Sequence, residues 1–195
     1  MHDILNRNVY LVKAHLGLLK AANNYDIYDP QTKAIVMQCR EERMNPLTQI
    51  LRFTDYKRMT PFDIEIRTPQ GERVIRVKRG ISLFLSNVEV MDEQDRIIGG
   101  FKQKLFSIGG SFTVLDAIDR PVCQLQGNWI GWNFRFLSGN QELARVTKEW
   151  GGLSKELLTT ADDYILQISD SVPANDPARP LILAAVMCID MVLKE

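Results

Sequence analysis

Apolar and polar residues alternate in many short segments of this chain. In the segment FDIEIRT, residues 62–68, every second position from Phe62 to Ile66 is apolar, and the positions between them are charged. Successive side chains of a β-strand point to opposite faces, so this alternation is typical of a strand with one buried face and one solvated face. The pattern predicts a mainly β protein.

These segments come in pairs that are separated by residues typical of turns. The sequences PQT (30–32) and PQG (69–71) separate the first two clear pairs, and each pair is predicted to form a β-hairpin. The predicted strands lie at 9–12, 25–29, 34–39, 62–68, 73–79, 87–92, 96–104, 111–117, 121–127, 133–139, 142–149 and 162–169. About twelve strands at this spacing predict an all-β barrel or sandwich. Glycines at 99, 100, 109, 110, 127 and 131 lie inside strand-like segments and predict bulges or tight bends where the sheet curls toward closure.

The C-terminal segment has a different pattern, because the run from Leu181 to Ile189 is apolar at every position. Pro180 is the predicted first helical residue, because Arg179 precedes a proline and is therefore biased away from helical geometry. The predicted helix runs from about 180 to 194, and its roughly fifteen residues would extend about 22 Å, against about 30 Å of bilayer hydrocarbon. A helix that is apolar on every side and too short for the bilayer is expected inside the ring of strands. A transmembrane span is the alternative, and the length disfavours it.

Length and composition limit the classes of protein to consider. A chain of 195 residues without a linker or low-complexity tract is predicted to form a single domain, residues 1–195. Its 24 basic residues balance 24 acidic residues, so no global field favours nucleic acid, and binding to an anionic membrane would need a local patch.

The cysteines and the N-terminal segment indicate where the protein resides. Cys39, Cys123 and Cys188 lie far apart in apolar surroundings, which indicates reduced core thiols and neither a disulfide framework nor a zinc site. The first twelve residues lack the continuous apolar stretch of a signal peptide. We therefore expect a cytoplasmic protein, with peripheral attachment to a membrane as an open option.

The stretch ARVTKEWGGLSKELLTTADDYILQIS, residues 144–169, together with the apolar C-terminal run, resembles the end of the phospholipid scramblase family. That family belongs to the tubby-like group, which also contains the plant LURP-one-related proteins. The matching positions are Lys148, Trp150, Gly152, Lys155, Glu156, Thr160, Ala161, Asp162, Tyr164, Gln167, Ile189 and Asp190. The resemblance extends from about Asn23 to Glu195 and implies a closed antiparallel barrel of twelve strands around a central hydrophobic C-terminal helix.

The resemblance also implies a calcium-binding segment, over residues 160–171. A calcium loop needs oxygen ligands at alternating positions and an acid at the twelfth. In this chain only Asp162 fits well, while Tyr164 occupies the fifth position and Ser171 the twelfth. The simpler interpretation is that Asp162 and Asp163 begin a strand, so we expect no calcium, no other metal and no cofactor.

Catalytic chemistry has little support in the sequence. The two histidines, His2 and His15, lie near the N-terminus, and the chain contains neither a Walker sequence nor a GxGxxG loop. We therefore expect a protein that is not an enzyme.

Basic residues on the segment 73–79 and just after residue 100 form the one candidate anion site. Tubby-like domains include phosphoinositide binders, so the resemblance implies a lipid headgroup as ligand. The predicted headgroup-binding residues are Arg73, Arg79, Lys102 and Lys104. Strand alternation places Arg73 and Arg79 on one face, and Arg76 and Lys78 on the other. An ordinary solvated outer face is the alternative interpretation of these cations.

Together these observations favour a scramblase-related binding module that contacts anionic phospholipid at a membrane surface without catalysis. Two alternatives stay open: a scramblase-type lipid transporter, and a regulatory or scaffold protein with a protein partner and no lipid ligand. We expect no nucleic-acid partner and no transmembrane span.

Overall fold

A computed structural model describes residues 1–14, 24–41, 60–80, 87–103, 111–128, 133–148 and 163–193. Within these ranges the chain forms a short 3₁₀ helix, twelve strands and one α-helix. The elements are η1 (Asp3–Asn6), β1 (Val9–Ala14), β2 (Tyr25–Tyr28), β3 (Ile35–Arg40), β4 (Phe62–Arg67), β5 (Arg73–Arg79), β6 (Asn87–Met91), β7 (Ile97–Gln103), β8 (Phe112–Asp116), β9 (Pro121–Asn128), β10 (Asn133–Ser138), β11 (Gln141–Thr147), β12 (Tyr164–Ile168) and α2 (Ala178–Leu193). The predicted mainly β architecture is confirmed, strand by strand.

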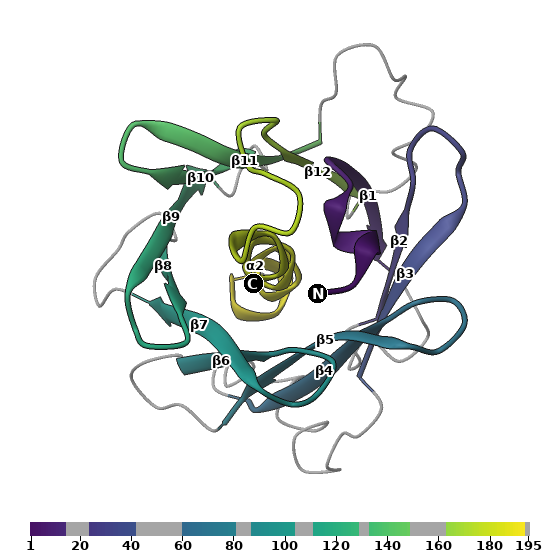
Figure 1. The fold of residues 1–195 in the computed structure, drawn as a ribbon, viewed down its shortest axis with the longest axis horizontal. Helices are drawn as coiled ribbons and strands as arrows, with labels where there is room; N and C mark the ends of the chain where they lie inside the picture. Colours follow the sequence, from purple (N-terminus) through teal and green to yellow (C-terminus); the bar gives the residue numbers. More distant parts are fainter. Residues whose placement is uncertain are drawn as a thin grey trace.

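The twelve described strands close into one barrel (Figure 1). Each strand pairs antiparallel with the next one in the chain, and β1 pairs with β12 to complete the ring. An even number of strands allows this closure to be antiparallel throughout. A closed ring also leaves no unpaired sheet edge, which removes the aggregation hazard of an open sheet.

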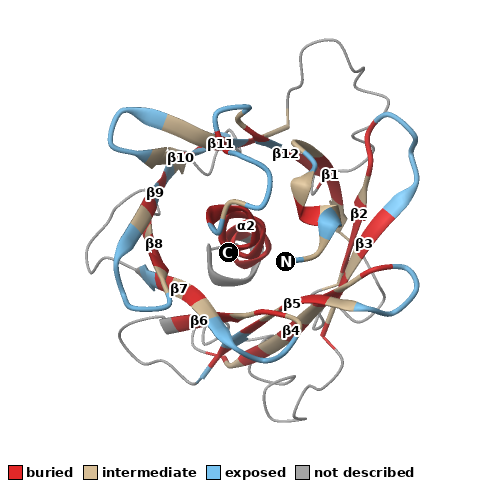
Figure 2. Ribbon diagram, viewed as in Figure 1, coloured by how far each residue is buried: buried red, intermediate tan, exposed pale blue. Residues whose placement is uncertain are grey.

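Helix α2 lies inside this barrel, as predicted (Figure 2). Every residue from Leu181 to Ile189 is at most 2% exposed. The helix contacts β5, β7, β8 and β12, so the inward side chains of the strands surround it and explain why the run is apolar on all sides. Within the described part, no helix is long and apolar enough to cross a membrane.

Helix α2 begins at Ala178, two residues before the predicted start at Pro180. A carboxylate oxygen of Asp176 accepts a hydrogen bond from the Ala178 backbone N–H at 2.8 Å and caps the first turn. Pro180 costs no helical hydrogen bond, because the first N–H groups of a helix have no partner within the helix. The predicted start was therefore two residues too late, because Arg179 is helical here although it precedes a proline.

The Arg179 guanidinium anchors the start of α2 to the N-terminal segment, although the residue is only 2% exposed. Nη1 donates to the carbonyls of Leu5 and Arg7 at 3.3 and 3.1 Å, and Nε donates to the Pro173 carbonyl at 2.7 Å. Nη2 donates to Asn8 Oδ1 at 2.8 Å and to the Val172 carbonyl at 2.6 Å. We call this arrangement the Arg179 clamp. It satisfies a buried guanidinium with neutral oxygens and joins both ends of the described chain.

Two hairpin turns repeat one local design. In the β6–β7 turn, Asp92 accepts hydrogen bonds from the N–H groups of Gln94 and Arg96, and Asp95 adopts a left-handed conformation with φ +60°. In the β8–β9 turn, Asp116 and Asp119 play the same two parts, with φ +63° at Asp119. Aspartate tolerates this backbone region better than most residues do. The sequence D-x-x-D-R thus fixes both turns and sets the direction of the second aspartate.

Gly99 shows why the predicted tight approaches fall on glycine. A Cβ atom there would lie 2.2 Å from the Leu115 carbonyl oxygen and 2.8 Å from Leu181 Cδ2 of the central helix. Gly100 and Gly127 have equally close backbone neighbours, at 2.3 Å from Val88 O and 2.4 Å from Asn133 O. A register shift between Val90 and Met91 places a predicted bulge beside Gly99, where the wall comes close to the helix. Gly109, Gly110 and Gly131, which carried the same prediction, lie outside the described residues.

Candidate anion-binding sites

A β-bulge in the β4–β5 hairpin determines which arginines share a face. The register between β4 and β5 shifts, because Ile75 pairs with Ile66 while Arg73 pairs with Arg67. Val74 is therefore an extra residue, and Arg73 lies on the same outer face as Arg76. The predicted separation of Arg73 from Arg76 was wrong, because strict alternation fails across a bulge.

Arg79 is buried inside the barrel and is 2% exposed. Its Nη2 donates to the Thr60 backbone carbonyl at 2.5 Å, and its guanidinium lies 4.8 Å from the centre of the Phe62 ring. Arg73 and Arg79 therefore lie on opposite faces, and the expectation that they share one was wrong. The inward position of Arg79 does not present it at the outer surface.

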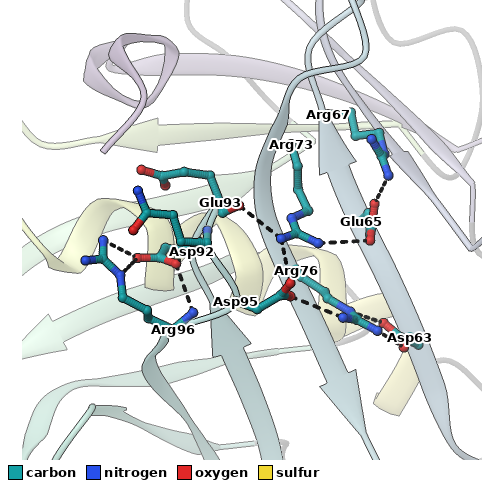
Figure 3. Close-up of polar contacts among 10 residues, drawn as sticks. Asp63, Glu65, Arg67, Arg73, Arg76, Asp92, Glu93, Asp95 and Arg96 are labelled. Atoms are coloured by element: carbon teal, nitrogen blue, oxygen red, sulfur yellow. Dashed lines mark hydrogen bonds and ion pairs between the residues drawn. The ribbon is translucent and has the colours of Figure 1, made fainter.

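The outer face of β4 and β5 carries a charge network with the β6–β7 turn (Figure 3). We call it the β4–β7 network, and its members are Asp63, Glu65, Arg67, Arg73, Arg76 and Asp95. Asp95 lies between two arginines, with Arg73 Nη2 at 2.8 Å and Arg76 Nη1 at 3.1 Å. Arg76 also holds Asp63 through two hydrogen bonds of 2.8 and 2.7 Å. Three arginines thus face three carboxylates.

Electrostatics in the β4–β7 network favours the ionised forms. Hydrogen bonds from Arg73 and then Arg76 lower the pKa of Asp95 below its ordinary value. The hydrogen bonds that Asp63 and Asp95 accept raise the pKa of Arg76. An anionic ligand at Arg73 would have to displace carboxylates that are already well placed. The geometry therefore favours a structural role for Arg73.

Lys102 lies on the outer face of β7 and is exposed. Its Nζ is 2.9 Å from Asp119 Oδ1, in the second turn of the D-x-x-D-R design. A shallow cleft of about 260 Å³ adjoins it, lined among others by Glu89, Asp116 and Asp119. Acidic groups outnumber basic ones there. Lys104, the fourth predicted residue, lies outside the described residues, so the structure does not bring the predicted set together in one described site.

A second open cleft, of about 470 Å³, lies on the outer face where β11, β12 and β1 meet. Its polar lining consists of Asn8, Glu142, Arg145, Gln167, Ser169 and Asp170. Arg145 holds Glu142 with two hydrogen bonds of 2.9 and 3.1 Å, which raise the pKa of the arginine. The residue directly opposite Arg145 on β10 is Arg135.

The pairing of Arg135 with Arg145 was not predicted from the sequence. The available signal was that Arg135 and Arg145 each stand between two apolar residues, in FRF and ARV, on the strands of one hairpin. Their pairing across that hairpin depends on a register shift next to Phe136. Strand alternation alone does not reveal such a shift.

Groups that could support catalysis or bind metal are few in the described ranges. These ranges contain no cluster of three or more His, Cys, Asp or Glu side chains that could hold a metal ion. All three cysteines are free and buried, and burial raises the pKa of Cys123 and Cys188 to about 12, so their thiols stay protonated at neutral pH. His2 lies at the surface with Nε2 3.2 Å from Glu72.

The calcium-binding segment that the resemblance implied is described only from Asp163 onward, and Asp162 lies outside the described residues, as does His15. Asp163 is 1% exposed and has Lys13 Nζ at 3.8 Å. A lysine beside this carboxylate competes with a cation for it.

Fold and surface together define the class of the protein. A closed antiparallel barrel of twelve described strands around a C-terminal helix is the tubby-like architecture that the resemblance implied. The scramblase family model matches residues 4–195, and the chain therefore belongs to the scramblase family. The resemblance found in the sequence is confirmed.

A solved structure supports the fold. An X-ray structure of a protein from Arabidopsis thaliana superimposes with a TM-score of 0.53, covering 93% of this chain and 90% of that chain. The two sequences are 13% identical, so the likeness concerns the fold alone.

Proposed function

We propose that this protein is a non-catalytic binding module that contacts anionic phospholipid at a membrane surface. Membership of the scramblase family supports a lipid-related role. The observation that carries the surface mode of contact is the enclosure of helix α2, whose residues Leu181–Ile189 are buried on every side. The outer wall of the barrel, and not the helix, is the surface available for lipid.

The energetics of the helix support this mode of contact. Six large apolar side chains in Leu181–Ile189 contribute roughly 1.5–3 kcal/mol each by burial, or roughly 9–18 kcal/mol together. That sum is comparable with the whole stability of a typical domain, about 5–15 kcal/mol. Withdrawing the helix would also expose the inward residues of the strands to water. The protein is therefore expected to meet a membrane with its barrel closed.

Co-sedimentation with vesicles tests the proposal. We expect the protein to pellet with vesicles of phosphatidylcholine and phosphatidylserine at low salt, to stay in the supernatant with phosphatidylcholine alone, and to be released as salt screens the attraction. Equal partition with both vesicles at low salt would refute the proposal.

We still propose that Lys102, together with Lys104 two residues further along the chain, contacts lipid headgroups. Because Asp119 already offsets the charge of Lys102, Lys102→Ala should weaken vesicle binding only about twofold. Lys33→Ala, in the β2–β3 turn, removes the same charge from another part of the barrel and serves as the control. Equal losses in the two variants would mean that Lys102 acts only through net charge.

Lipid transport is the second candidate, because the family match favours it equally. Reconstituted vesicles with one labelled leaflet distinguish the two functions. If the protein binds with helix α2 enclosed, the asymmetry of the label should stay unchanged, with or without calcium. Loss of asymmetry that depends on the protein would support the transporter.

A further inference from the structure

A row of exposed polar side chains crosses the outer face from β9 to β12. Cross-strand pairing places Gln126 opposite Arg135, Arg135 opposite Arg145, and Arg145 opposite Gln167. All four residues are exposed. We call them the β9–β12 row. Four neighbouring strands thus present two arginines between two glutamines, each of which offers amide N–H donors.

The centre of the row is electrostatically unfavourable in the free protein. Side chains directly opposite each other on antiparallel strands have Cβ atoms about 4.5–5.5 Å apart, and like charges in that position are destabilising. Glu142 compensates Arg145 by binding its Nε and Nη2. Nη1 of Arg145 is left without a partner among the described residues. No carboxylate among the described residues compensates the charge of Arg135 in this way.

Arg135 differs from the other arginines of the described ranges. The rest contact a carboxylate or a backbone carbonyl, as in the β4–β7 network and the Arg179 clamp. Arg135 makes no hydrogen bond or ion pair with any described residue. Among the described arginines, Arg135 alone lacks such a contact, and it lies opposite Arg145, which lines an open cleft of about 470 Å³.

We infer that Arg135 and Arg145 bind a phosphate group of an anionic ligand, with Gln126 and Gln167 as flanking donors. A guanidinium presents N–H groups in a planar fork that matches two oxygens of a phosphate. Arg135 can present such a fork, while Arg145, whose Nε and Nη2 hold Glu142, can add its Nη1 from the opposite strand. The phosphate would remove the repulsion between the arginines. The adjoining cleft, whose lining includes Asn8 and Ser169 as well as the carboxylates of Glu142 and Asp170, provides space for the group that carries the phosphate.

This inference rests on the proposed function where the phosphate belongs to a lipid headgroup, and a free phosphate is the other source of the same chemistry. Arg135→Gln/Arg145→Gln tests it, because glutamine keeps a polar side chain and removes the fork. The matched control is Arg96→Gln/Arg120→Gln, which removes two exposed charges from hairpin turns outside the row.

The lipid arm compares vesicles of phosphatidylcholine with phosphatidic acid against vesicles with phosphatidylserine at equal negative charge. Wild type should prefer the exposed phosphate of phosphatidic acid, and the row variant should lose about tenfold in that affinity while the control keeps the preference. Equal losses in the two variants would overturn the site and leave membrane binding intact. Failure of wild type to bind either vesicle would refute the proposed function.

The free-ligand arm measures the thermal midpoint of the same proteins with inorganic phosphate, and with sodium chloride at matched ionic strength. A rise specific to phosphate in wild type and the control, absent from the row variant, supports the site even where vesicles do not bind. An equal rise in all three proteins would overturn it. A rise in none, combined with the preference for phosphatidic acid, assigns the phosphate to lipid.

Discussion

The outer wall over β4–β7 and the outer wall over β9–β12 both carry arginines on strand surfaces, yet they use them differently. In the β4–β7 network three arginines meet three carboxylates, and Asp95 connects Arg73 with Arg76. In the β9–β12 row Arg135 and Arg145 oppose each other, and Glu142 is the carboxylate that contacts one of them. The role of a surface arginine therefore depends on its cross-strand neighbours.

The turns produce much of this difference. The β6–β7 turn has an aspartate, Asp95, at its left-handed position and so directs a carboxylate onto β5. The β10–β11 turn has Gly139 at its left-handed position, with φ +57°, and presents no carboxylate there. Asp95 of the β6–β7 turn therefore neutralises arginines of the β4–β7 network, whereas the β10–β11 turn supplies no carboxylate at its left-handed position to Arg135.

The interior that both walls share gives the largest expected effect. Arg179→Met should lower the free energy of unfolding by about 3 kcal/mol or more, because several buried oxygens of the Arg179 clamp lose their donor at once. Urea unfolding followed by fluorescence measures it. Arg120→Met, at an exposed turn, is the control and should change stability by less than about 0.5 kcal/mol. A similar small change at Arg179 would contradict the clamp.

Breaking the β4–β7 network should have an intermediate effect. Arg76→Met removes two hydrogen bonds to Asp63 and one to Asp95, and should lower the free energy of unfolding by about 1 kcal/mol. Urea unfolding at low and high salt measures it, and the loss should shrink as salt screens the charges. If the urea midpoint of Arg76→Met at low salt equals that of wild type, Arg76 does not stabilise the protein.

Acid should affect the network through Asp95. Its pKa in the folded protein lies below the ordinary 3.8, so its contribution to stability is present above that value and is lost as pH falls through the lowered pKa. The stability difference between wild type and Asp95→Asn should therefore be largest near neutral pH and should narrow below about pH 4. Unfolding curves from pH 7 to pH 2.5 measure it. A difference that stays constant over this range would exclude a titrating Asp95.

The same variant in an Arg76→Met background sharpens the result. If the two side chains act through one pair, Asp95→Asn should cost less there than in wild type. Additive losses would mean that Arg73 alone accounts for the contribution of Asp95.

The smallest effect is expected in the β9–β12 row. Arg135→Gln should change the free energy of unfolding by less than about 0.5 kcal/mol, and any change should be a gain, because it removes like-charge repulsion with Arg145. The same urea experiment measures it. A loss above about 1 kcal/mol would show that Arg135 has a structural role and would end the contrast between the walls.

The candidate sites were predicted less well than the fold, for reasons visible at single residues. Strict alternation places Arg73 and Arg76 on opposite faces of β5. The bulge at Val74 adds one residue between them, so both side chains lie on the outer face. Arg79 belongs to a basic segment that predicts an exposed surface. Its side chain is nevertheless buried inside the barrel, with the guanidinium over the Phe62 ring. The pairing of Arg135 with Arg145 depends on a second register shift. A bulge adds a single residue to one strand, and the pattern of apolar residues in the sequence does not show where it occurs.

The sequence by itself determined the strands, their hairpin turns and the enclosed C-terminal helix. These features depend on periodicities of two residues and on an apolar run, which are local properties of the chain. Only the tertiary structure decided which charges meet: Asp95 with Arg73 and Arg76, the Arg179 clamp between the two ends of the described chain, and Arg135 beside Arg145. Such contacts depend on register and barrel closure. Those properties follow from the packing of all twelve strands around one helix, so no single segment encodes them.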